Sequence, residues 1–119
     1  MAEEERGIVR AIVRGFSRAI ILWLISKKPA SGYSIVKEIE GLTGQKFHTG
    51  IVYPLLYELE KDGFISGGWT QKGRRRIKYY SITEKGNKLL NQLRQRFEMP
   101  VKEVLKDFLR ENASQKMPV

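Results

Sequence analysis

The 119-residue sequence contains no cysteine, one histidine and two aspartates, and each of these shortages excludes a class of chemistry. Without cysteine there are no thiolate zinc sites, cysteine nucleophiles or thiol redox reactions, and the chain suits a reducing compartment. One imidazole and two aspartates leave little material for a metal site or a catalytic triad. We therefore expect a protein that is not an enzyme and that carries no cofactor and no metal.

Long hydrophobic runs are also absent. The longest apolar run, Ala19 to Ile25, has seven residues, whereas a membrane-spanning helix needs about 20. The acidic residues Glu3 to Glu5 precede this run and Lys27 to Pro29 follow it, which is not the arrangement of a secretory signal. These features predict a cytoplasmic protein with no membrane partner.

What the sequence has in excess is positive charge. Its 22 lysines and arginines outnumber 13 aspartates and glutamates, so the formal net charge is +9. Such a surplus on a small surface indicates a polyanionic partner or an anionic membrane surface. The length favours a single domain with one core.

Apolar residues at three- and four-residue steps predict helices in the first half of the chain. The first helix is expected from Ile8 to Lys28 with this stripe: Ile8, Val9, Ile12, Val13, Phe16, Ile20, Trp23, Leu24. A second helix is expected from Ser31 or Gly32 to Thr43, ended by Gly44. A third helix is expected from Thr49 to just before Gly63, with this stripe facing a core: Val52, Leu55, Leu56, Leu59.

The second half of the chain predicts a hairpin and then a further helix. Residues 64–71 and 77–83 are rich in aromatic and β-branched residues and flank a basic tip, which is typical of two paired strands. Gly67 and Gly68 predict a bulge in the first strand. Thr83 is expected to cap a helix that Pro100 kinks or divides near Met99.

This order of elements predicts a mainly α fold with a small β-hairpin, a winged helix-turn-helix followed by a C-terminal dimerisation helix. We expect a basic helical extension over residues 1–14, the winged-helix domain over 15–83, the dimerisation helix over 84–112 and a polar tail over 113–119. No internal repeat or second domain is indicated.

Five motifs in this order resemble the PadR family of transcriptional regulators. They are Gly32-Tyr33-Ser34-Ile35, Thr49-Gly50-Ile51-Val52-Tyr53-Pro54-Leu55-Leu56, Leu59-Glu60-Lys61-Asp62-Gly63-Phe64-Ile65, Gly73-Arg74-Arg75-Arg76-Ile77-Lys78-Tyr79-Tyr80 and Thr83-Glu84-Lys85-Gly86. The resemblance covers about residues 16 to 90. It implies a dimeric DNA-binding winged helix, usually a repressor, that dimerises through its first and last helices. The short C-terminal region resembles the subfamily with one C-terminal helix, and His48 stands where a small hydroxyl residue is more usual.

Candidate DNA-binding residues come from three places. The hairpin tip concentrates cations with no acid between Gly63 and Thr83, which suits phosphate or minor-groove contact: Lys72, Arg74, Arg75, Arg76, Lys78. The start of the third helix, the part of a recognition helix that enters the major groove, contributes His48, Thr49, Gly50 and Tyr53. The start of the second helix contributes Ser31, Tyr33 and Ser34, whose hydroxyls serve equally well as helix caps or as phosphate ligands.

Two other sets of residues leave alternatives open. The stripe Arg6, Arg10, Arg14 and Arg18 is either a solvated face partly paired with Glu3 to Glu5 or an additional contact to the DNA backbone. The expected dimer interface comprises Phe16, Ile20, Leu90, Leu93, Phe97, Val101, Val104 and Phe108. Trp23 and Phe97 either belong to the core and this interface or line a pocket for a small aromatic effector at the dimer centre, as in multidrug-responsive members of the family.

The charge alone leaves the biological role open, and a third possibility beside the two below is an RNA-binding or protein-interaction winged helix, which would show no preference for duplex DNA. A homodimer that reads a pseudo-palindromic operator in double-stranded DNA is favoured. The alternative is a non-specific chromatin or architectural protein, because phosphate contacts alone supply sequence-independent binding.

Overall fold

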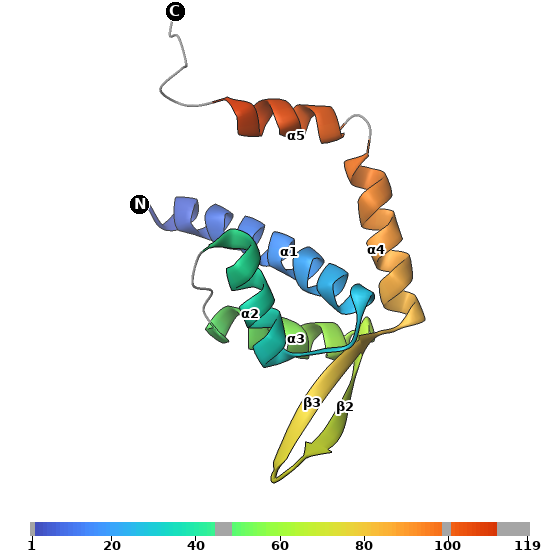
Figure 1. Ribbon diagram of the computed structural model, residues 1–119. Coiled ribbons are helices and arrows are strands. Elements are labelled where there is room, and N and C mark those ends of the chain that lie inside the picture. Colours follow the sequence, from blue (N-terminus) through green and yellow to red (C-terminus); the bar gives the residue numbers. More distant parts are fainter. Residues whose placement is uncertain (1, 45–48, 99–100, 112–119) are drawn as a thin grey trace, which may run out of the picture.

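The computed structural model describes residues 2–44, 49–98 and 101–111 (Figure 1). Its elements follow one another as α1 (Glu3–Lys27), β1 (Ala30–Ser31), α2 (Gly32–Thr43), α3 (Thr49–Lys61), β2 (Ile65–Lys72), β3 (Arg75–Ile82), α4 (Glu84–Phe97) and α5 (Val101–Arg110). Within these ranges, no helix is long and apolar enough to cross a membrane. The mainly α fold with a hairpin wing confirms the predicted fold class.

The first helix is longer than predicted. It begins at Glu3, where three glutamates occupy the first turn and interact favourably with the positive end of the helix dipole. It then continues without a break past residue 14, so the expected N-terminal extension and the first helix of the domain are one helix. It ends at Lys27, two residues before Pro29.

The second helix has defined caps at both ends. Ser31 Oγ accepts a hydrogen bond from Ser34 N at 3.1 Å, and Ser34 Oγ accepts one from Ser31 N at 3.0 Å. The helix ends at Gly44, whose φ of 70° is a left-handed conformation that glycine adopts without strain. The predicted end of this helix is therefore confirmed.

The core lies between α1, α2 and α3 and is closed by the sheet and by α4. The residues buried in it are Ile21, Leu22, Leu24, Ile25, Ile35, Val36, Ile39, Val52, Leu55, Leu56, Leu59, Ile65, Tyr80 and Leu90. The predicted stripe of the third helix is wholly buried, because it faces α1 and α2. Most of the first half of α1 lies outside this core.

The sheet has three antiparallel strands in the order β1-β3-β2. The short strand β1, which pairs Ala30 with Tyr80, was not predicted from the sequence. The predicted bulge at Gly67 and Gly68 is wrong, because both glycines pair one-to-one with Tyr80 and Tyr79. At the hairpin tip Gly73 has a φ of 61°, as the first central residue of a type II′ turn requires.

The C-terminal region forms two helices rather than one. Thr83 caps α4, since its Oγ1 accepts a hydrogen bond from Gly86 N at 3.0 Å. Gly86 lies directly against the wing, where an added Cβ would overlap the Phe64 carbonyl. The helix ends at Phe97, and α5 turns away from it (Figure 1). The chain is thus divided as expected, although Met99 and Pro100 lie outside the described residues.

Candidate nucleic-acid interface

The hairpin of β2 and β3, which we call the wing, carries four exposed cations. Lys72, Arg74, Arg75 and Arg76 lie at or beside the turn between β2 and β3, and none of them has an ion pair within the described ranges. Figure 1 shows the wing projecting beyond α3 and away from α1. Arginine presents several N–H donors in a planar fork that matches phosphate oxygens. The wing tip is therefore chemically suited to bind a polyanion.

Lys78 differs from the other cations that were predicted to contact DNA. Its Nζ donates a hydrogen bond to Glu60 Oε1 of α3 at 2.9 Å, and this bond raises the pKa of Lys78 above its usual value. The same carboxylate accepts a bond from Gly67 N at 3.2 Å. The sequence segment from Gly63 to Thr83 has no acid, but α3 supplies one from outside it. Lys78 is thus already neutralised within the protein.

The predicted recognition helix begins at Thr49, and Gly50 in its first turn is exposed. The side chain of Thr49 and all of His48 lie outside the part of the chain that the structure describes. Tyr53 is 47% exposed and its ring also packs against α2, where a Cβ at Gly32 would overlap it. The glycine at position 32 therefore allows α3 to approach the start of α2 closely.

The hydroxyls at the start of α2 act as helix caps. Ser31 and Ser34 satisfy each other's backbone N–H groups, and Ser34 Oγ also donates to the Ser31 carbonyl at 2.9 Å. Tyr33 is exposed and makes no such bond to any residue that the structure describes, and Lys37 Nζ lies 5.7 Å from its ring centroid. Of the two roles open for this segment, capping is observed, and phosphate contact stays a prediction.

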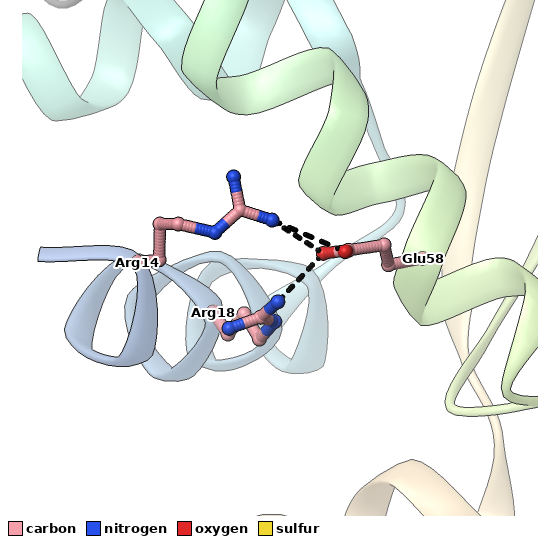
Figure 2. A network of polar contacts seen from close by, with 3 residues as sticks. All are labelled: Arg14, Arg18 and Glu58. Carbon is pink, nitrogen blue, oxygen red and sulfur yellow. Dashed lines mark hydrogen bonds and ion pairs between the residues drawn. The ribbon is translucent and has the colours of Figure 1, made fainter. Parts of the chain in front are cut away.

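The arginine stripe of α1 is largely paired with carboxylates. Arg6 lies 3.6 Å from Glu3, as expected from the sequence. Figure 2 shows that Arg14 and Arg18 both reach Glu58 of α3, at 3.1 Å and 2.8 Å. Only Arg10 of the four has no ion pair among the described residues. This network links α3 to α1. Within the described part of the chain, pairing with Glu3 to Glu5 is seen only for Arg6, since Arg14 and Arg18 are partly buried against Glu58, and a contact of the stripe with DNA stays a prediction.

A second exposed surface is apolar and lies on α1, α4 and α5. Phe16 of α1 contacts Phe97 of α4, with ring centroids 6.2 Å apart. On α5, Val104, Phe108 and Leu109 are 66%, 71% and 70% exposed. We call this the apolar face: Ile8, Val9, Ile12, Val13, Phe16, Ile20, Phe97, Val104, Phe108, Leu109.

The apolar face contains most of the residues predicted for the dimer interface, with three exceptions. Leu90 is buried in the core, so it has almost no surface left to contact a second chain. Leu93 of α4 is partly buried. The side chain of Val101 lies outside the described part of the structure. We therefore correct the predicted interface by removing Leu90.

Trp23 and Phe97 line one groove, as the pocket hypothesis requires. Its volume is about 440 Å³, within the range of small-molecule sites. The apolar walls come from α1, α4 and α5 and include Leu93, Leu105 and Leu109. Cationic residues also border the groove: Arg94, Lys102, Lys106.

Three packed helices followed by a β-hairpin with a cationic tip define the class of this protein as a winged helix-turn-helix DNA-binding protein. The sequence profile described as "Transcriptional regulator PadR-like family" matches residues 21–92, and the chain belongs to this family. The predicted family is thus confirmed, and it is a family of DNA-binding transcriptional regulators rather than enzymes.

Individual relatives agree with this assignment. The transcriptional regulator YqjI of Escherichia coli (strain K12) is 31% identical over 87 residues, which cover 71% of this chain and 41% of that protein. The chain thus spans about two-fifths of the length of this curated relative. A PadR-like regulator from Bacillus cereus strain ATCC 14579 superposes with a TM-score of 0.72 at 26% identity, covering 86% of this chain and 99% of that one. A regulator from Clostridium thermocellum gives 0.71 at 29% identity, covering 84% and 96%.

Proposed function

We propose that this chain is a homodimeric repressor that acts in the cytoplasm and binds a pseudo-palindromic operator with its two α3 helices and two wings. The observation that carries the proposal is the set of exposed wing cations beyond α3 that have no ion pair among the described residues, namely Lys72, Arg74, Arg75 and Arg76. Phosphate contacts from the wing fix the position of the protein, and base contacts from the first turn of α3 supply sequence preference.

The apolar face supports dimerisation. It exposes large side chains on α1, α4 and α5, of which Phe16 and Phe97 are in contact, and exposed apolar patches mark protein interfaces. A twofold dimer brings two copies of α3 to successive major grooves, about 34 Å apart along the duplex. His48, Thr49, Gly50 and Tyr53 are the proposed base-reading residues, and bound dimers repress by occluding the promoter.

The groove at Trp23 and Phe97 supports an effector site. A small aromatic ligand that fills it would contact α1, α4 and α5, the elements of the proposed dimer interface, and so shift the spacing of the two wings. The cations around the groove favour a ligand with an acidic group. Aromatic acids should then quench Trp23 fluorescence saturably and weaken operator binding, and a panel without quenching would remove the effector from the proposal.

The competing function is a sequence-indifferent architectural protein, which the net charge of +9 supports equally well. A selection experiment separates the repressor from the architectural protein. Bound duplexes are selected from a random pool, and their affinity is compared with that of unselected DNA at one salt concentration. The repressor requires one enriched sequence with twofold symmetry. An architectural protein would enrich no sequence, although it would bind every duplex.

A further inference from the structure

The wing carries an exposed indole that no helix covers. Trp69 lies in β2 and is 59% exposed. Trp69 pairs with Lys78, and Gln71 pairs with Arg76. Directly opposite residues share a face of the sheet, and so do residues two apart along one strand, such as Trp69 and Gln71. One face of the wing therefore presents Trp69 and Arg76 together.

This face of the wing is the one that leans on the recognition helix. Lys78 and Gly67 both lie on it, and both bond to the carboxylate of Glu60 in α3. The inner part of the face is thereby fixed to α3, and the outer part, with Trp69 and Arg76, continues past the helix. A duplex that seats α3 in its major groove would bring the adjoining backbone strand into this corner.

Two cations lie near the indole. The guanidinium carbon of Arg76 lies 5.0 Å from the ring centroid of Trp69, and Lys78 Nζ lies 5.9 Å from it. A guanidinium over an aromatic ring keeps its edge N–H groups free to donate, and the stacking reduces its conformational freedom. Lys78 is anchored by Glu60, so it limits where the ring can lie.

We propose that Trp69 and Arg76 form a clamp for one sugar-phosphate unit of the DNA backbone. The indole packs against a deoxyribose, and Arg76 donates to the adjacent phosphate. Lys78 is a positioning residue that holds the indole through Glu60 and makes no phosphate contact of its own. The clamp rests on the proposed function, and because it contacts only backbone it is indifferent to sequence.

The first test follows the indole directly. In full-length Trp23→Phe protein, Trp69 is the single tryptophan, and acrylamide, a neutral quencher, reports its exposure without changing ionic strength. Saturation with a mixed-sequence duplex should lower the quenching constant and shift the emission to shorter wavelength. Unchanged quenching at saturation would overturn the clamp. Failure of the protein to bind any duplex would instead overturn the proposed function.

The second test separates the two halves of the clamp by affinity and salt dependence. Trp69→Ala should bind selected and unselected duplexes about ten-fold more weakly. The log-log salt slope, which is the slope of the logarithm of the binding constant against the logarithm of the salt concentration, should be unchanged. Arg76→Gln should lower the slope by about 0.9 for each phosphate that the protein no longer neutralises. Arg110→Gln removes the same charge from an exposed site on α5 and is the matched control, with the wild-type slope expected.

The positioning role of Lys78 has its own readout. Lys78→Gln should weaken binding while leaving the salt slope at the wild-type value, because its charge is already paired with Glu60. Lys78→Arg, which can keep that pair, should restore the affinity. A slope reduction in Lys78→Gln equal to that in Arg76→Gln would assign Lys78 to a phosphate and contradict the proposed division of roles. Thermal unfolding by circular dichroism checks that each variant is folded.

Discussion

The wing and the apolar face are both exposed, but they present opposite chemistry. The wing tip directs cations into solvent, and the register places two of them, Lys72 and Arg75, directly opposite each other. Like charges in that position destabilise a hairpin. The apolar face exposes Val104 and Phe108 on a helix that contacts little besides α4. The exposed wing-tip cations and the exposed side chains of α5 bury little surface within the chain, so we explain each by what it binds.

The difference between them lies in the kind of partner that would stabilise each surface. A polyanion removes the repulsion at the wing without removing much apolar area from water. Covering the apolar face gains about 25 cal/mol for each Å² of apolar surface removed from water, which a second copy of the chain can supply. The core, which includes Tyr80 of β3 and Leu90 of α4, connects the wing to α4.

Breaking the apolar face should have the largest effect. Phe97→Asp combined with Val104→Asp places two charges at the proposed interface, and desolvating unpaired charges costs several kcal/mol. Light scattering should then give the mass of one chain, against twice that mass for the wild type. Asn87→Asp with Gln92→Asp adds the same charge at exposed polar positions of α4 and should stay dimeric. A wild-type protein that is monomeric at micromolar concentration would refute the interface.

Replacing Tyr53 should affect sequence reading rather than general DNA binding. Tyr53→Ala should cost about 1 to 3 kcal/mol on the selected operator alone, with the salt slope nearly unchanged. Tyr53→Phe is the control, because it keeps the ring packed on Gly32 and removes only the hydroxyl. Equal weakening of Tyr53→Ala on all sequences would make this residue a backbone contact or a packing residue.

Replacing single wing cations should weaken selected and unselected DNA alike. Arg74→Ala or Arg75→Ala removes one phosphate contact from each subunit, so the log-log salt slope of a dimer should fall by about 1.8, at about 0.9 per contact. Filter binding over a range of salt concentrations measures this slope. Normal binding of both duplexes would mean that the cluster is only a solvated loop.

The smallest expected effect concerns the ion pair that fixes the wing to α3. Because Glu60 raises the pKa of Lys78, the pair stabilises the fold below the ordinary pKa of 10.5, and this contribution is lost as the pH rises through the raised value. Lys78→Gln should lower the free energy of unfolding by about 0.2 to 1 kcal/mol near neutrality. The difference should shrink in strongly alkaline solution. Urea unfolding tests this, with Lys88→Gln, from the more exposed pair with Glu84, as the control.

Much of the fold was predictable because its signals are local. Apolar periodicity indicated α1 to α3, and Thr83 and Gly44 marked helix ends whose capping depends on residues within a few positions. The strand β1 was not predictable, since two residues have no periodicity and Ala30 pairs with Tyr80 far along the chain. The bulge was wrongly predicted because Gly67 has a different use: a Cβ there would overlap Lys78 and crowd Glu60.

The candidate site was predictable only as a set of charges. The cluster in residues 72–78 was visible in the sequence, but which cations are paired depends on acids from other elements. Glu60 lies 18 residues from Lys78, and Glu58 lies 44 and 40 residues from Arg14 and Arg18. Trp69 was missed because an aromatic residue in a strand usually indicates packing, and only the register places it on the same face of the wing as Arg76, where it stays exposed.

The central claim is that the wing positions a dimer whose third helices read sequence, and one measurement tests it most directly. It is the ratio of affinities for a duplex selected from a random pool and for unselected DNA, taken at one fixed salt concentration. A sequence-specific regulator should bind the selected duplex at least about 10³-fold more tightly. A ratio near one would show that binding rests on phosphate contacts alone and would contradict the account.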